Sequence, residues 1–150
     1  MAEFNLKDIR EEFEARAADV GSDISRFIFS DLGTDINKSR KKEDYPLVLL
    51  KPPTSVFSDF LRSPFEKYNI EFFVFDTYFN DVAETKPLDE IWSETELLGT
   101  RMLRRVFKNQ ELWNIVDDDV NVERGHMEHN DKLVGVRFTL TIQLFANCDE

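Results

Sequence analysis

The clearest pattern in the chain is an alternation of apolar and polar residues near its C-terminus. Between Lys132 and Cys148 an apolar residue occupies every second position: Val134, Val136, Phe138, Leu140, Ile142 and Leu144. A period of two predicts a half-buried β-strand. Strands usually contain about 5–6 residues, so this one is unusually long, and we expect it to extend past its own core. Its unpaired backbone groups are then open to another chain; the alternative is a bent strand that serves one sheet.

The opposite face of this strand is polar without being densely charged. It carries Arg137, Thr139, Thr141 and Gln143. Such a face suits packing against a partner or lining a passage. These four residues are therefore candidate subunit-interface or channel-facing residues.

Two other strands are expected in the first 80 residues. Residues 47–50 form a short apolar run, and the prolines on both sides disfavour a helix there. Residues 67–79 also alternate, but both of their faces are apolar, which predicts that both are covered, by helices or by another subunit. Phe73 and Phe75 lie on the second of these faces. They are candidate contact residues as well.

Two segments show helical spacing. In residues 1–33, apolar residues recur at steps of three and four from Leu6 to Phe27, and Gly33 is a suitable end. The second helix is expected at 87–112, with Pro87 in its first turn. Its acidic residues come early and its basic residues late, which is the order that the helix dipole favours.

The remaining segments complete the expected fold. Residues 34–44 are predicted to be a polar connector, 54–64 a loop, 113–123 a strand and 124–131 a turn. The order is then α-β-β-α-β-β in a single domain, 1–150, whose α+β body starts at residue 45. We expect an α+β fold: an antiparallel sheet of about four strands with two main helices packed on one face.

Charge and composition exclude several classes of function. The net charge is −11, whereas contacts with phosphate groups need clustered Lys and Arg. General nucleic-acid binding and docking on an anionic membrane are therefore not expected. The charge fits either solubility or a surface that repels DNA passing through a pore. With one cysteine, no signal sequence and no long apolar run, we expect folding in a cytoplasm.

Candidate chemistry is sparse. His126 and His129 lie in a polar turn, and their spacing is not that of a zinc-binding helix. Asp117, Asp118 and Asp119 lack the spacing of a calcium loop, so they are interpreted as an exposed acidic edge and as candidate contact residues. We therefore predict no catalytic residue, no metal site and no cofactor. A small hydrolase or a metal enzyme that uses the two histidines is the enzymatic alternative.

The chain resembles the tail-terminator and head–tail joining proteins of tailed bacteriophages. Tyr45 to Leu50, followed by Pro52 and Pro53, is similar to the first strand of that family. Residues 87–112 are similar to its central helix, and the stretch from Asp131 through Ile142 to Asp149 is similar to its last strand. The resemblance covers residues 45–149, and the long N-terminal helix departs from the compact members.

The resemblance implies a structural protein of the virion, made in the cytoplasm of a bacterial host. Its copies are expected to form a homo-oligomeric ring, with a hexamer favoured, in which strands of neighbouring subunits join around the DNA channel. The implied partners are other phage neck or tail proteins. Genomic DNA passes through without specific binding, and no membrane is involved. The alternative is a cytoplasmic protein-binding module or assembly chaperone that forms no ring.

Overall fold

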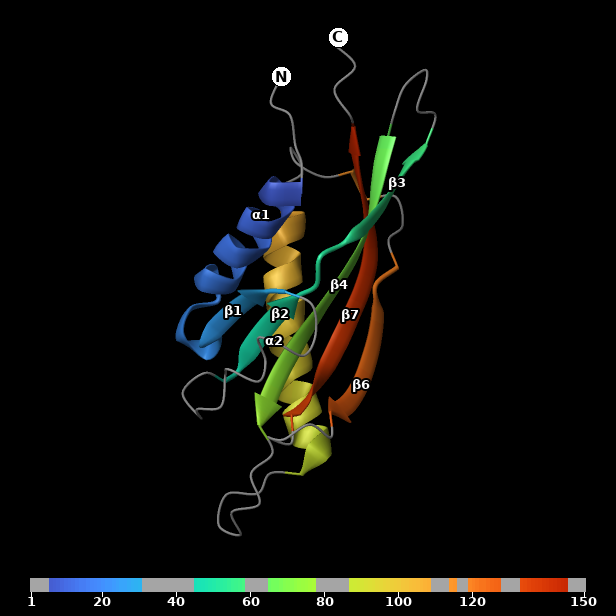
Figure 1. Cartoon of the computed structure of the whole chain (residues 1–150). Coiled ribbons are helices and arrows are strands. Elements are labelled where there is room, and N and C mark those ends of the chain that lie inside the picture. The colour runs from blue at the N-terminus through green and yellow to red at the C-terminus, as the bar shows by residue number, and fades with distance from the viewer. Residues whose placement is uncertain are drawn as a thin grey trace.

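Two long antiparallel strands form the spine of the molecule. The computed structural model describes residues 6–30, 45–58, 65–77, 87–108, 114–115, 119–127 and 133–145. Strands β4 (Phe65–Thr77) and β7 (Leu133–Phe145) contain 13 residues each. They pair without interruption from Phe65 opposite Phe145 to Thr77 opposite Leu133. At about 3.3 Å per residue, this twisted ribbon spans roughly 40 Å and runs the length of the molecule (Figure 1).

Shorter strands extend the ribbon on both sides. On the free side of β4, β2 (Leu47–Leu50) pairs with its second half and β3 (Thr54–Ser58) with its first half, both antiparallel. Strand β1 (Arg26–Phe29) lies parallel to β2. On the free side of β7, β6 (Asn121–Met127) and the two-residue β5 (Asn114–Ile115) pair with different parts of that strand. The described residues thus form one mixed sheet of seven strands.

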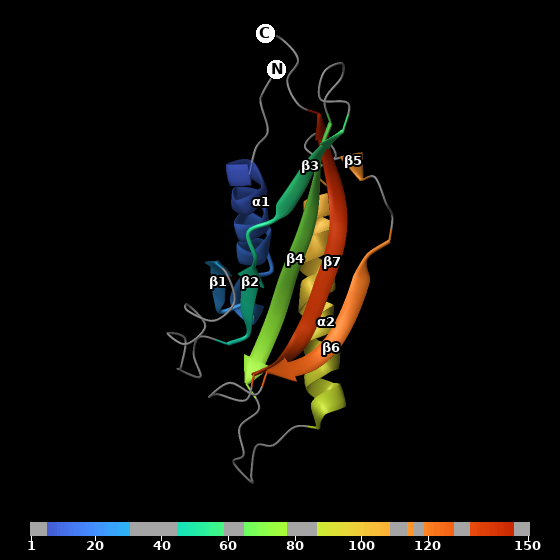
Figure 2. The ribbon, with the colours of Figure 1, turned by 45° about the vertical axis from the view of Figure 1, so that its right-hand side comes forward.

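Both helices pack on the same face of this sheet. Helix α2 (Leu88–Phe107) lies behind the ribbon in both views, and helix α1 (Leu6–Asp19) packs beside α2, to the left of the ribbon (Figures 1 and 2). They bury the inward residues of β4 and β7, and Phe72 stacks on Phe138 with ring centroids 4.8 Å apart. Phe13 of α1 packs on the same cluster, 5.7 Å from Phe72. Aromatic side chains therefore supply much of the main core.

A glycine lets α2 approach the sheet closely. A Cβ atom at Gly99 would lie 2.4 Å from Cε2 of Phe138, a ring that is buried and stacked. Any larger residue would push the helix away from β7. The position of α2 is therefore fixed by the small size of this one residue.

A second, smaller core lies on the opposite face, which we call the outer face. It contains five buried residues from β1, β2, β4 and the segment before β2: Ile28, Tyr45, Leu47, Leu49 and Phe75. Phe73 packs against them. The prediction that both faces of 67–79 are covered is confirmed in part for the described residues, up to Thr77: one face meets the helices, and part of the other meets this cluster.

The expected order α-β-β-α-β-β is wrong, because four strands lie between α1 and α2. The expected sheet of about four antiparallel strands is wrong as well. The sheet is mixed and has seven strands in the described residues, since β1 and β2 are parallel. The expected helix over residues 1–33 is also wrong, because α1 ends at Asp19. Gly21 has a φ of 84°, a conformation that glycine adopts readily and that ends helices. Residues 26–29 then become a strand, so the apolar spacing of three and four continued past the end of the helix by coincidence.

Two other predicted boundaries are wrong, because they depend on which strands pair with each other. The expected loop at 54–64 contains β3, which forms because β2 leaves the first half of β4 unpaired. The expected strand at 113–123 is divided into β5 and β6, and β6 continues to Met127 into the expected turn. The expected connector at 34–44 lies outside the described residues.

The long last strand is not at the edge of the sheet. Strand β7 pairs with β4 along its whole length on one side, and with β6 and β5 along most of the other. The expectation that this strand overhangs and offers an open edge is therefore wrong. Its length is used inside the sheet, as the long partner of β4.

No helix among the described residues is both long and apolar enough to cross a membrane.

Two glycines that face each other in neighbouring strands give a matched test of this packing. Gly125 of β6 lies opposite Gly135 of β7. A Cβ atom at Gly135 would lie 2.1 Å from the Val74 carbonyl oxygen, whereas one at Gly125 would meet nothing within 4 Å. We predict that Gly135→Ala lowers the free energy of unfolding by about 1–3 kcal/mol, measured by urea denaturation. Gly125→Ala is the control and should change it little; equal effects would contradict this packing.

Candidate functional site

The outer face gathers most of the residues predicted from the sequence. Arg137, Thr139 and Thr141 lie on this face of β7, because their neighbours in the strand are buried under the helices. The register places Phe73 opposite Arg137 and Glu71 opposite Thr139. Gln143 shares their alternation and lies opposite Lys67. Asp119 lies nearby, whereas Asp117 and Asp118 are outside the described residues.

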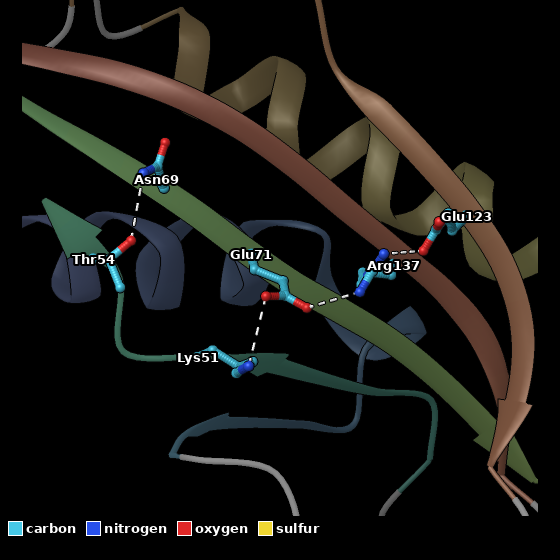
Figure 3. A network of polar contacts seen from close by, with 6 residues as sticks. All are labelled: Lys51, Thr54, Asn69, Glu71, Glu123 and Arg137. Carbon is cyan, nitrogen blue, oxygen red and sulfur yellow. Dashed lines mark hydrogen bonds and ion pairs between the residues drawn. The ribbon is translucent and has the colours of Figure 1, made fainter.

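A row of charges with alternating sign crosses the middle of this face (Figure 3). Nζ of Lys51 lies 3.6 Å from Oε2 of Glu71. Nη1 of Arg137 lies 3.4 Å from Oε1 of the same glutamate, and its Nη2 pairs with Glu123. The row therefore joins the segment after β2 to β4, β7 and β6. Two cations and two anions balance, so the row has no net charge.

The partners in this row are partly exposed, from 27% for Glu71 to 65% for Glu123. Ion pairs in such positions contribute about 0.2–1 kcal/mol each, because water screens them. Their main effect is to favour one register between four neighbouring segments. The row is thus a structural feature of the face.

The two ends of the outer face differ in character. At one end the rings of Phe73 and Phe75 are stacked, with centroids 5.2 Å apart. They border a shallow groove of about 190 Å³ that runs over the backbone of Gly135 and Gly125. At the other end the face is polar, and Asn69 accepts a hydrogen bond from Thr141 and donates one to Thr54. The charged row lies between these two ends.

Asp119 borders an open hollow at the polar end. The hollow has a volume of about 340 Å³ and is also lined by Lys51, Asn69, Glu71 and Asn121. Among the described residues, no group of three or more His, Cys, Asp or Glu is placed to hold a metal ion. His126 belongs to β6, and His129 lies outside the described residues.

Strand β3 was not expected from the sequence, which predicted a loop at 54–64. It pairs with β4 on one side, and no described strand pairs with its other side. Between Thr54 and Ser58 it has no charged residue, and Val56 is 60% exposed. Strand edges are usually protected by charges, by proline or by a cover. The β3 edge has none of these within its own residues.

Polar contacts on both faces of the sheet hold β3 against β4. On the helix side, the Glu66 carboxylate accepts hydrogen bonds from Oγ of Ser55 at 2.7 Å and from Oη of Tyr68 at 2.6 Å. On the outer face, Nδ2 of Asn69 donates to Oγ1 of Thr54 at 3.4 Å. The edge is therefore held in an extended conformation before any partner meets it.

The other edge strands are better protected. Strand β6 contains Glu123 and Arg124, and two side-chain contacts join it to α2: Nε1 of Trp92 donates to the Gly125 carbonyl oxygen at 3.0 Å, and Arg124 pairs with Glu96 at 2.7 Å. Strand β1 begins with Arg26 and lies beside α1, whose Arg10 sits over a ring of that strand. Strand β3 is thus the longest edge strand without a charged residue in the described part of the chain, since the uncharged β5 has only two residues.

Comparison with known proteins adds no relative. No protein-family model matches the chain, and no curated protein matches it in sequence. A proposal for the function therefore depends on the arrangement of the site and on the resemblance of the sequence to the phage neck and tail proteins.

Sequence reasoning found the outer face but missed the residues that organise it. Lys51, Glu71 and Glu123 meet Arg137 only because of the register between four segments. That register cannot be read from any one strand. For the β3 edge the sequence offers only the absence of charge in the five residues after Pro53, which show no alternation.

The hydrogen bond from Tyr68 to Glu66 within β4 predicts a loss of stability at high pH. Burial, together with the hydrogen bond from its hydroxyl to Glu66 and the negative charge there, raises the pKa of Tyr68 above its ordinary value of about 10. The protonated phenol is thus favoured in the folded state, so this stabilisation is complete below about pH 10 and is lost above it. We predict that Tyr68→Phe lowers stability at pH 7 and makes its decline above pH 10 less steep, measured by urea denaturation. An unchanged decline would contradict this role.

The charged row predicts a coupling that depends on salt. In a double-mutant cycle of Arg137→Met with Glu71→Gln, we expect a coupling energy of about 0.2–1 kcal/mol in dilute buffer. It should fall in 1 M NaCl, because the pair is partly exposed to screening ions. The more exposed pair Lys7–Glu11 is the control and should couple less. A coupling that does not respond to salt would contradict the description of the row.

Proposed function

We propose that this chain is a structural protein of a phage virion, of the tail-terminator or head–tail joining type. It acts by assembling into a homo-oligomeric ring around the DNA channel, and it joins or terminates the tail there. The observation that supports this role is the uncharged, exposed edge of β3. The resemblance of its sequence patterns to the neck and tail proteins points in the same direction.

An open strand edge is a template for association. Its outward N–H and C=O groups can form hydrogen bonds with an extended segment of another chain, while side chains such as Val56 add apolar contact. When the added segment comes from a different part of an identical subunit, the contact is heterologous. Repeated contacts of this kind close into a ring if the rotation between subunits permits. We propose that the neighbouring subunit supplies this segment.

The fold suits such a contact because the edge is rigid. Strand β3 is paired with β4, which is itself paired with β7 over 13 residues. The contacts of Glu66 and Asn69 fix the side chains next to the edge. A pre-organised edge loses less conformational entropy when it binds. Subunits that keep their shape also favour a ring of one size.

The charge of the chain agrees with passage of DNA. The net charge is −11, and a surface of this sign does not retain a polyanion. Lys51 and Arg137, the two cations of the charged row, are each paired with a carboxylate. The proposal therefore includes transit of the genome without specific binding, and it assigns no catalytic residue.

The same edge would serve a binding module or chaperone that forms no ring. In that case the added strand comes from a different protein, and the pure chain does not assemble. The mass of the purified protein distinguishes these functions, because the ring needs only copies of this chain. A stable monomer would favour the binding module.

A charge at the centre of β3 should prevent ring formation. We predict that Val56→Glu raises the concentration at half-assembly about tenfold or more, because it places a carboxylate where the added strand must pack. The measurement is light scattering or mass photometry over a concentration series. The far-ultraviolet circular dichroism of this variant should be unchanged, since Val56 is 60% exposed.

Leu6→Glu is the matched control. Leu6 lies on α1 and is 40% exposed, so this variant also replaces an exposed apolar residue by a glutamate. It should assemble like the wild type. If Val56→Glu assembles as readily as Leu6→Glu, the β3 edge is not the ring contact.

A further inference from the structure

The exposed side of α2 carries a stripe with an ordered change of charge. The stripe consists of exposed residues that are three or four positions apart and lie on the side of α2 opposite the core: Glu90, Ser93, Leu97, Arg101, Arg104 and Lys108. The stripe begins with an acid and ends with three cations. Leu97, at its centre, is 51% exposed and is one of the few large apolar side chains exposed on the described surface.

This stripe is complementary to itself when reversed. If two copies of α2 pack antiparallel with their Leu97 residues in contact, each residue meets the one equally far on the other side of position 97. Arg104 of one copy then faces Glu90 of the other, and Arg105 faces Asp89. The pairing occurs twice, because a two-fold contact repeats every interaction.

The residues that would pair are available. Within the described residues neither Arg104 nor Arg105 forms an ion pair, and Glu90 and Arg104 are exposed. Arg101 has a contact of its own, with Asp23 at 3.8 Å, in which both side chains are half exposed or more. The stripe is therefore not already covered by the fold.

The helix dipole explains only part of this pattern. It favours acids in the first turn and cations in the last turn of any helix. It does not call for an exposed leucine midway between them, nor for the charges to share one stripe with that leucine. A chain with a net charge of −11 also repels its own copies unless opposite charges meet locally. This stripe is a place where they meet.

We propose that α2 is a contact surface for a second copy of this chain, with the two helices antiparallel and Leu97 at the two-fold axis. The inference goes beyond the proposed ring and does not depend on it. The ring contact uses the β3 edge, whereas this contact uses the side of α2 that faces away from the sheet (Figure 2). Two subunits joined through α2 keep both of their β3 edges open.

Charge reversal tests the contact by loss and by rescue. Glu90→Arg and Arg104→Glu each place like charges opposite one another twice in the dimer. Either variant alone should raise the dimer dissociation constant about tenfold or more in dilute buffer, measured by sedimentation velocity in the Val56→Glu background. An equimolar mixture of the two should dimerise again. One copy then carries cations at both positions and the other carries carboxylates at both, so opposite charges meet in each pair. The variant with both changes should also dimerise.

Rescue by mixing separates a contact from a loss of folding. A variant that fails to fold cannot be restored by another copy. Glu14→Arg, on the exposed side of α1, makes the same change of net charge as Glu90→Arg and should dimerise like the parent. The inference is overturned if the parent protein stays monomeric at millimolar concentration, if the single variants dimerise as well as the parent, or if the mixture does not associate. Because the Val56→Glu change removes only the ring contact, failure of either proposal is recognised separately.

Discussion

The uninterrupted pairing of β4 with β7 is the interaction on which the rest of this structure depends. It joins 13 residues of each strand, and every other strand in the described part of the chain attaches to it directly or through β2. Its inward residues form the base on which both helices pack. Its outward residues form the face that carries the charged row. The long alternating segment near the C-terminus is thus an internal strand of the sheet and does not project from it.

The position of the open edge follows from the length of β4 in this pair of strands. Strand β4 is longer than any of its partners on the free side, so two short strands share it: β2 covers residues 72–75 and β3 covers residues 65–69. Strand β2 is followed outward by β1, whereas β3 has no further partner among the described residues. The unprotected edge therefore arises where a long strand meets a short one. The proposed contact therefore uses β3 and not β7, where the sequence suggested it.

The sequence predicted well those elements whose pattern is long or has clear boundaries. The helix at 88–107 and the strands at 47–50, 65–77 and 133–145 were all expected, with errors of a few residues at their ends. Periodicity predicts such elements because a long stripe fits only one period. It failed at 26–29, where Phe27 continued the spacing of the preceding helix while Gly21 had already ended it. It failed at β3 because five residues are too few to show a period.

The site was predicted only in part, for a related reason. Alternation alone placed Arg137 and Thr139 on a polar face, and this needs no knowledge of neighbours. The partners Glu71, Lys51 and Glu123 depend on register across four segments, and the identity of the edge strand depends on which strands remain unpaired. Both are properties of the assembled sheet. They become visible only when all strands are in place.

The central claim is that copies of this chain assemble into a closed ring, and electron microscopy of the purified protein tests it most directly. Class averages of the protein alone should show rings with a central opening, and sixfold symmetry is the expected form. The opening should be wide enough for duplex DNA to pass. Particles no larger than one or two subunits at every concentration would contradict the account.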